Sequence, residues 1–139
     1  SIEKLTSKID QLFAKNVYFK LPDIAQYDIT ESGKCLLYEV STASAFHILR
    51  ATESILNKYY KKLLRRNSNG KTWGQIINEL QNKNRGRLPN AVTINHLRNI
   101  KDSYRNPTQH PEKTYDIDEA QDLFNLCIDV INKMSDEIN

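Results

Sequence analysis

The chain has 139 residues, with 20 Lys or Arg and 17 Asp or Glu, so its formal net charge is +3 with histidine neutral. Its length suits one domain that needs no disulfide or structural metal, because a chain of this size buries roughly two-thirds of its unfolded surface. The low content of Gly (4) and Pro (4) excludes a collagen-like or low-complexity chain and argues against an all-β fold rich in tight turns.

Helical periodicity begins near the N-terminus. One apolar stripe predicts a short first helix: Ile2, Leu5, Ile9, Leu12 and Phe13. Pro22 interrupts the pattern, so we expect a loop over residues 15–28, and a second short helix from Ser32 to Glu39.

A long helix is predicted next. Ser41 or Thr42 is expected to cap it, and it should end near Arg66. Its apolar positions recur at steps of three and four: Ala45, Ile48, Leu49, Thr52, Ile55, Leu56, Tyr59 and Leu63.

Capping signals mark the remaining helices. Thr72 and Gln75 form a capping box, and Asn90 can cap a helix that Pro107 should end at about Arg105. Asp116 and Glu119 open a last helix with core spacing at Ala120, Leu123, Phe124, Cys127, Ile128, Ile131 and Met134. The fold class is therefore expected to be all-α, an antiparallel bundle of about four to five helices.

Cysteine usage and hydropathy indicate the compartment. Cys35 and Cys127 lie far apart among apolar residues, so we expect small buried side chains in a reduced protein, with a disulfide as the alternative.

No Cys or His pair has the short spacing of a zinc site. The sequence also contains no apolar run of about 18 residues, the length that a membrane span requires. We expect a cytoplasmic protein without a metal or cofactor. Because the chain does not begin with Met, a further domain is an expected partner.

Charge is unevenly distributed. Residues 58–113 hold thirteen Lys or Arg against three acids, a net charge of +10, whereas residues 1–57 carry −1 and residues 114–139 carry −6. A basic stretch with acidic flanks suggests a surface for a polyanion such as RNA, although long solvated helices also accumulate Lys and Arg.

The chemistry is expected at the corner Arg105 to His110, within RNPTQH. Arginine supplies a permanent charge and a planar fork suited to phosphate, and histidine titrates near neutrality. Two prolines stiffen the turn that carries this pair. The alternative is local: Arg105 would neutralise the carbonyl end of its helix and His110 would bond within the turn.

These residues resemble the HEPN superfamily, the higher-eukaryote and prokaryote nucleotide-binding domains, whose signature is Arg, a polar residue, three more residues and His. Residues 33–53 (GKCLLYEVSTASAFHILRATE), 72–80 (TWGQIINEL) and the final helix (DEAQDLFNLCIDVINKM) are similar in sequence and order to a bacterial branch. The resemblance covers residues 28–135, with 1–27 as an N-terminal helix and loop of the same 1–139 domain.

The resemblance implies an all-α bundle that is usually a two-fold dimer, and in many members a metal-independent endoribonuclease of toxin, abortive-infection or other antiphage systems. It makes Arg105 and His110 the catalytic pair and Asn106 the polar residue after the arginine, with Glu53 and Arg50 as nearby polar positions. An antitoxin is then a further possible partner. Members silenced by nucleotide transfer carry a Tyr two residues after the His; here Glu112 stands there.

Residue chemistry agrees with RNA cleavage. The 2′-hydroxyl is the nucleophile, so the site needs a base, an acid and positive charge for the phosphorane. One chain offers a single well-placed histidine, whereas a symmetric dimer would supply two, one as base and one as acid. Other readings remain: a bundle that binds RNA or a nucleotide without cutting, a dimerisation module of a larger protein, and a simple surface ion pair between Arg50 and Glu53. His47 and His96 are expected to be packed or solvated.

Overall fold

The computed structural model describes residues 2–139, and every regular element in that range is helical. The elements are α1 (Ile2–Leu5), the 3-10 helix η1 (Ile9–Leu12), α2 (Val17–Lys20), α3 (Asp23–Leu37), α4 (Ser41–Leu64), α5 (Trp73–Gln81), α6 (Ala91–Ile100), the π-helical segment η2 (Lys101–Arg105), α7 (Asn106–Thr108) and α8 (Ile117–Ile138). The predicted all-α bundle is confirmed. The number of helices is slightly higher than predicted, because the N-terminal segment contributes several short ones.

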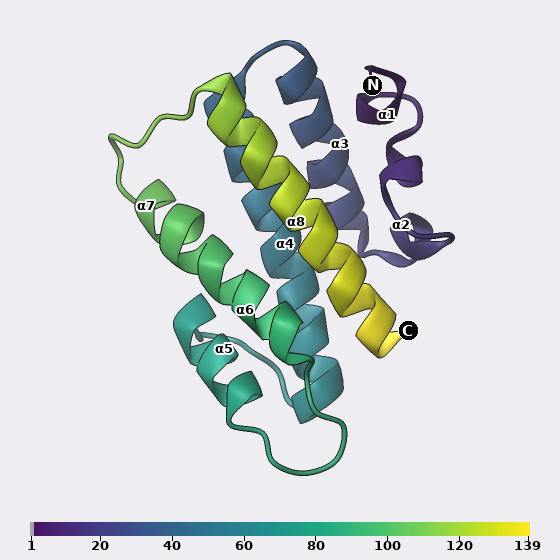
Figure 1. Ribbon diagram of the computed structural model, residues 1–139, viewed down its shortest axis with the longest axis vertical. Coiled ribbons are helices and arrows are strands. Elements are labelled where there is room, and N and C mark those ends of the chain that lie inside the picture. Colours follow the sequence, from purple (N-terminus) through teal and green to yellow (C-terminus); the bar gives the residue numbers. More distant parts are fainter. Residues whose placement is uncertain (1) are drawn as a thin grey trace.

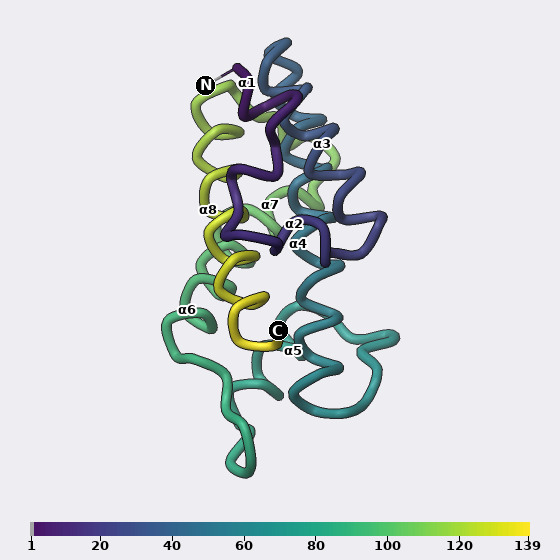
Figure 2. The backbone as a smooth tube through the Cα atoms, turned by 90° about the vertical axis from the view of Figure 1, so that its right-hand side faces the viewer, coloured from purple at the N-terminus to yellow at the C-terminus, as the bar shows by residue number. Residues whose placement is uncertain are grey.

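Helix α4 is the central element of the bundle and packs most extensively on α3 and α8. α3 and α4 run antiparallel, as do α6 and α8, while α4 and α8 run in the same direction (Figure 1). α5 lies against α4 and α6 at one end, and the short N-terminal helices lie along α3 (Figures 1 and 2). Fully buried side chains from several helices form the core, among them Tyr59, Tyr60, Leu97 and Phe124. No helix within residues 2–139 is both long and apolar enough to traverse a bilayer.

The N-terminal prediction was wrong in three places. The expected first helix is divided into α1 and η1, and the loop predicted over residues 15–28 contains α2 and the start of α3 at Asp23. The helix predicted from Ser32 to Glu39 is the last part of α3, which ends at Leu37. Pro22 does not break α3, because it occupies the N-cap position, where a missing N–H costs no helical hydrogen bond. α3 also contains Gly33, where a Cβ would lie 2.7 Å from the carbonyl oxygen of Leu5; the glycine therefore allows α1 to approach α3 closely.

The predicted cap of α4 was also wrong. The N-cap residue is Val40, and no side chain caps this end. Thr42 instead accepts a hydrogen bond from the backbone N–H of Tyr115, at 3.0 Å, which ties the start of α4 to the chain just before α8. At the other end α4 stops at Leu64, and Arg65 adopts a left-handed conformation with φ 56°.

The remaining caps agree with the sequence. Thr72 and Gln75 form the reciprocal capping box of α5, and Asp116 and Glu119 form that of α8. Asn90 accepts a hydrogen bond from the N–H of Val92 at the start of α6. These caps can be predicted from the sequence because both partners of each hydrogen bond lie within one helical turn.

The helix that carries the candidate corner is longer than predicted. Helical backbone continues through η2 and α7 to Thr108, three residues beyond the stop predicted at Arg105. The N–H of Asn106 bonds to the carbonyl of Lys101, a π-type spacing that widens the turn. In a regular α-helix Pro107 would press against the preceding turn; the wider turn accommodates its ring, so the helix continues.

Candidate functional site

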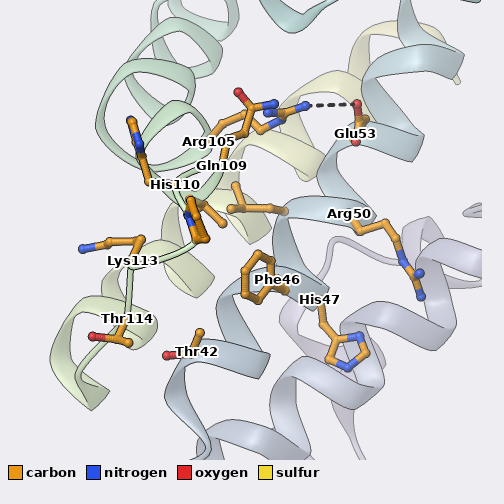
Figure 3. A pocket seen from close by; sticks show the side chains of 13 residues that line it. Thr42, Phe46, His47, Arg50, Glu53, Arg105, Gln109, His110, Lys113 and Thr114 are labelled. Carbon is orange, nitrogen blue, oxygen red and sulfur yellow. Dashed lines mark ion pairs between the residues drawn. The ribbon is translucent and has the colours of Figure 1, made fainter.

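An open pocket of about 800 Å³ lies between the N-terminal half of α4 and the corner that joins α7 to α8 (Figure 3). Three of its lining residues, Leu49, Thr108 and Pro111, provide a partly apolar wall. The other lining residues are Thr42, Phe46, His47, Arg50, Glu53, Arg105, Gln109, His110, Lys113 and Thr114. Four of the five predicted site residues therefore lie in one pocket.

Arg105 reaches into this pocket from the last residue of η2. Its side chain is 23% exposed and its guanidinium lies 3.9 Å from the carboxylate of Glu53 on α4. The guanidinium also lies over the ring of Trp73, 6.0 Å from the ring centroid. Glu53 and Trp73 thus orient a cation that remains accessible from the pocket.

His110 lies in the turn after α7 and is exposed. Its backbone N–H donates to the carbonyl of Pro107 at 3.1 Å, so the turn is closed by main-chain bonds. The imidazole points away from Arg105 at the rim of the pocket, whereas Arg105 extends toward Glu53 (Figure 3). Asn106 does not line the pocket; its N–H closes the π-type turn.

Tyr115, which the sequence did not single out, holds the corner in place. Its ring is buried and stacks with Tyr104 at a centroid distance of 6.5 Å. Its hydroxyl bonds to that of Thr108, and its N–H donates to Thr42. Lys113 lies over the same ring, 4.6 Å from the centroid. The corner is thereby fixed to both α4 and α7.

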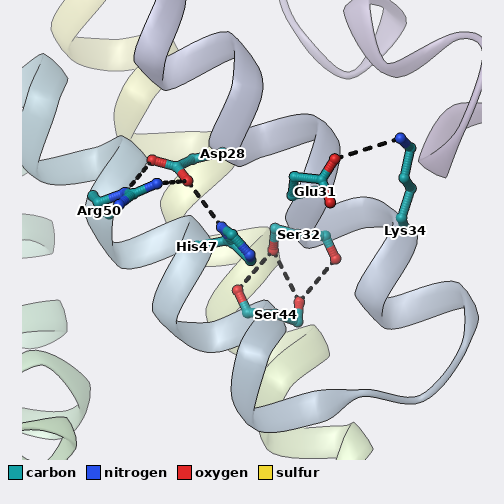
Figure 4. Close-up of polar contacts among 7 residues, drawn as sticks. All are labelled: Asp28, Glu31, Ser32, Lys34, Ser44, His47 and Arg50. Carbon is teal, nitrogen blue, oxygen red and sulfur yellow. Dashed lines mark hydrogen bonds and ion pairs between the residues drawn. The ribbon is translucent and has the colours of Figure 1, made fainter.

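A second polar cluster lies beside the pocket and centres on Asp28 of α3 (Figure 4). Its carboxylate is fully buried and accepts two bonds from Arg50, at 2.7 and 2.9 Å. His47 Nδ1 lies 2.9 Å from the same carboxylate. Arg50 therefore pairs with Asp28, and the ion pair with Glu53 suggested by their spacing does not form.

Three of the four Arg, Lys, Asp or Glu side chains that line the pocket are cations, and each of the three pairs with a carboxylate. The bonds to Asp28 raise the pKa of Arg50 above its usual value, and Arg50 is exposed on its other side. The ion pair with Glu119, 3.0 Å long, raises the pKa of Lys113. With Arg105, three cations line the pocket and Glu53 is its one acidic lining residue. These guanidinium and ammonium groups are hydrogen-bond donors of the kind that bind a phosphate.

Other candidate groups lie outside the pocket. Residues 2–139 contain no group of three or more His, Cys, Asp or Glu side chains placed to hold a metal ion. Cys35 is half-buried and Cys127 buried, both as free thiols. Burial raises the pKa of Cys127 to about 12, so this thiol stays protonated. His96 lies on α6, where its Nδ1 is 3.2 Å from Asp129.

Phe46 gives the pocket an exposed aromatic face. Its side chain is 50% exposed, and Tyr27 of α3, 54% exposed, packs edge-on against His47 nearby. Aromatic rings at a cationic surface can stack on a nucleobase or pack against another protein.

Comparisons with known proteins identified no relative of this chain. No family model matches the sequence, and neither the curated proteins nor the solved structures give a match.

Proposed function

We propose that this protein is a HEPN-like, metal-independent endoribonuclease that cleaves single-stranded RNA, in a toxin, abortive-infection or antiphage context in the cytoplasm. The observation that carries the proposal is that Arg105, His110 and Glu53 all line one pocket, where Arg105 pairs with Glu53. The motif supplies the residue types, and the pocket supplies a surface on which a phosphodiester can lie.

In this proposal Arg105 stabilises the charge that develops on the phosphorane, as a preoriented guanidinium does for a phosphate. His110 transfers the proton, either from the 2′-hydroxyl or to the leaving 5′-oxygen. The 2′-oxygen bonds to phosphorus and the bond to the 5′-oxygen breaks, which leaves a 2′,3′-cyclic phosphate and a 5′-hydroxyl. Water is not consumed in this step.

A second copy of the chain completes the site in the proposal. One chain provides one His110, and its exposed ring lies at the rim of the pocket rather than beside Arg105. A two-fold dimer would bring two such rims together and supply one imidazole as base and the other as acid. The exposed side chains of Phe46 and Tyr27, next to the pocket, are suited to bury apolar area in that contact.

The second candidate is an RNA- or nucleotide-binding module that does not cut. The separation of the His110 ring from Arg105 favours it, because a single chain then provides a cationic pocket with an aromatic wall and no assembled acid-base pair. A dimerisation module of a larger protein uses the same surface without a nucleic acid.

The test is RNA cleavage in EDTA. Wild-type protein should convert single-stranded RNA to fragments with cyclic-phosphate ends, and His110→Ala should lower the rate by at least 10²-fold, the usual contribution of an acid-base group. Arg105→Lys should also reduce the rate, because lysine keeps the charge but loses the planar fork. Helical circular dichroism should be unchanged in both variants.

His96→Gln is the matched control, since it alters a histidine outside the pocket and should leave the rate unchanged. RNA binding without cleavage would replace the leading proposal with the binding module. A wild-type activity that survives His110→Ala would refute the assigned role of His110.

A further inference from the structure

A second cationic surface lies at the far end of α4 from the pocket. Lys58, Lys61, Lys62 and Arg65 line one hollow, and Lys62 and Arg65 line a second hollow together with Lys83 and Arg87 from the α5–α6 loop. We call these six residues the basic end. No acidic side chain in residues 2–139 forms an ion pair with any of them.

The positive charges of the basic end do not, as a group, stabilise the fold. Lys58 and Lys62, like Lys61 and Arg65, are four residues apart on one helix, and like charges at this spacing repel. The helix dipole favours cations in the last turn, which accounts for Lys61 and Lys62 but not for the two cations of the neighbouring loop.

The backbone conformation of Arg65 is also not one that stability of the fold favours. It occupies the left-handed position after α4, with φ 56°, where glycine carries no steric penalty and an arginine does. A long cationic side chain is therefore present at a position where local backbone energetics favour glycine.

One ridge of α4 connects the pocket to the basic end. Glu53 lines the pocket, and Asn57, Lys61 and Arg65 follow it at steps of four, which place them along one ridge of the helix. The twelve-residue interval from Glu53 to Arg65 spans about 18 Å at 1.5 Å per residue. A strand stacked at the duplex spacing of about 3.4 Å per nucleotide covers that distance with about five nucleotides, and a more extended strand needs fewer.

We propose that the basic end is an anchoring site for the phosphate backbone of single-stranded RNA, separate from the pocket and reached along this ridge. The proposal depends on the proposed function for the identity of the ligand. It adds a requirement for length: a strand must span about 18 Å from the cleavage position, at most about five stacked nucleotides, to occupy both sites. Short oligonucleotides then occupy the pocket alone.

Fluorescence anisotropy with non-cleavable 2′-O-methyl oligouridine tests the anchor without requiring cleavage. Wild-type protein should bind a 12-mer far more tightly than a trimer. In Lys61→Gln/Lys62→Gln the slope of log affinity against log salt for the 12-mer should become shallower by about 1.4, at about 0.7 per lost phosphate contact. Trimer binding should be unchanged. With cleavable RNA, the double variant should raise KM for the 12-mer and leave kcat unchanged.

Lys4→Gln/Lys8→Gln is the matched control, because it removes the same charge from exposed lysines of the N-terminal segment. Arg65→Gly is the second variant and separates binding from folding: it should weaken 12-mer binding while raising Tm. Equal salt slopes in wild type and in Lys61→Gln/Lys62→Gln would overturn the anchor, as would an equal loss in the control. Binding to phosphatidylserine vesicles without binding to the 12-mer would also overturn it. If the 12-mer binds as expected but no RNA is cut, the anchor stands and the nuclease proposal fails.

Discussion

At the scale of single residues, Asp28 shows how a buried charge shapes the pocket without lining it. Its carboxylate is inaccessible to solvent and accepts bonds from His47 and Arg50, which both line the pocket. Buried charges persist where they are paired and hydrogen-bonded, so the two pocket side chains also satisfy Asp28. Positioning in the pocket and stability of the α3–α4 pair are therefore coupled at this residue.

Asp28→Asn tests that coupling. The isosteric amide directs an NH₂ group at donors that need an acceptor, so the free energy of unfolding should fall by about 1–3 kcal/mol. Urea denaturation measures the change, which should appear in the midpoint with an unchanged m-value.

Glu31→Gln is the control for this measurement. Glu31 lies on the same helix and pairs with Lys34 at 3.4 Å on the surface, where such pairs contribute about 0–1 kcal/mol. A change for Asp28→Asn no larger than that of the control would contradict the assigned role of Asp28.

The residues of the corner could be predicted from sequence, whereas the Asp28 cluster could not. RNPTQH carries its signal within six residues, and the structure places Arg105 and His110 in one pocket. Asp28 bonds to side chains 19 and 22 residues away on another helix. No local pattern encodes that pairing; it follows from the register of α3 against α4.

At the scale of elements, α5 is held to the end of α4 by a compact charge network. Glu79 of α5 accepts bonds from Arg66 and from the Tyr60 hydroxyl, and Lys71 lies 3.0 Å away. The bonds from Arg66 and Lys71 lower the pKa of Glu79 from 4.5 to about 2. The network thus stabilises this junction while Glu79 is ionised.

The stability of the folded protein should depend on pH through this carboxylate. A folded-state pKa below the unfolded value means that Glu79 stabilises the fold at pH above about 4.5 and loses that contribution as the pH falls toward 2. Thermal unfolding of wild type and Glu79→Gln should differ most near pH 6 and converge near pH 2.

Glu112→Gln provides the comparison, because Glu112 is exposed and forms no ion pair within residues 2–139. A gap between wild type and Glu79→Gln that stays constant from pH 6 to pH 2 would show that Glu79 does not carry this pH dependence.

Two prolines explain two of the errors in the predicted helix boundaries. Both were interpreted as breaks, yet Pro22 precedes α3 as its N-cap and Pro107 lies within α7. The first is accepted because the opening amides of a helix have no partner, and the second because η2 widens the preceding turn. Reciprocal caps correctly predicted where α5 and α8 begin, since those signals are local.

At the scale of the whole molecule, the parallel course of α4 and α8 separates the charges. The acidic start of α8, with Asp116, Asp118, Glu119 and Asp122, lies at the end of the bundle opposite the basic end at the terminus of α4 (Figure 1). The modest net charge of +3 thus conceals a basic group and an acidic group at opposite ends of the bundle.

This polarity has a kinetic consequence. A molecule whose charges are separated in this way rotates in the electric field of a polyanion. We therefore expect RNA to contact the basic end first and to enter the pocket afterwards. Added salt shortens the range of that orienting torque to about 10 Å at 0.1 M. Stopped-flow measurements should accordingly show an association rate constant that falls steeply with ionic strength. Reversal of the charges of the exposed Asp118 and Asp122, which form no ion pair within residues 2–139, should alter that rate and leave the capping box of α8 intact.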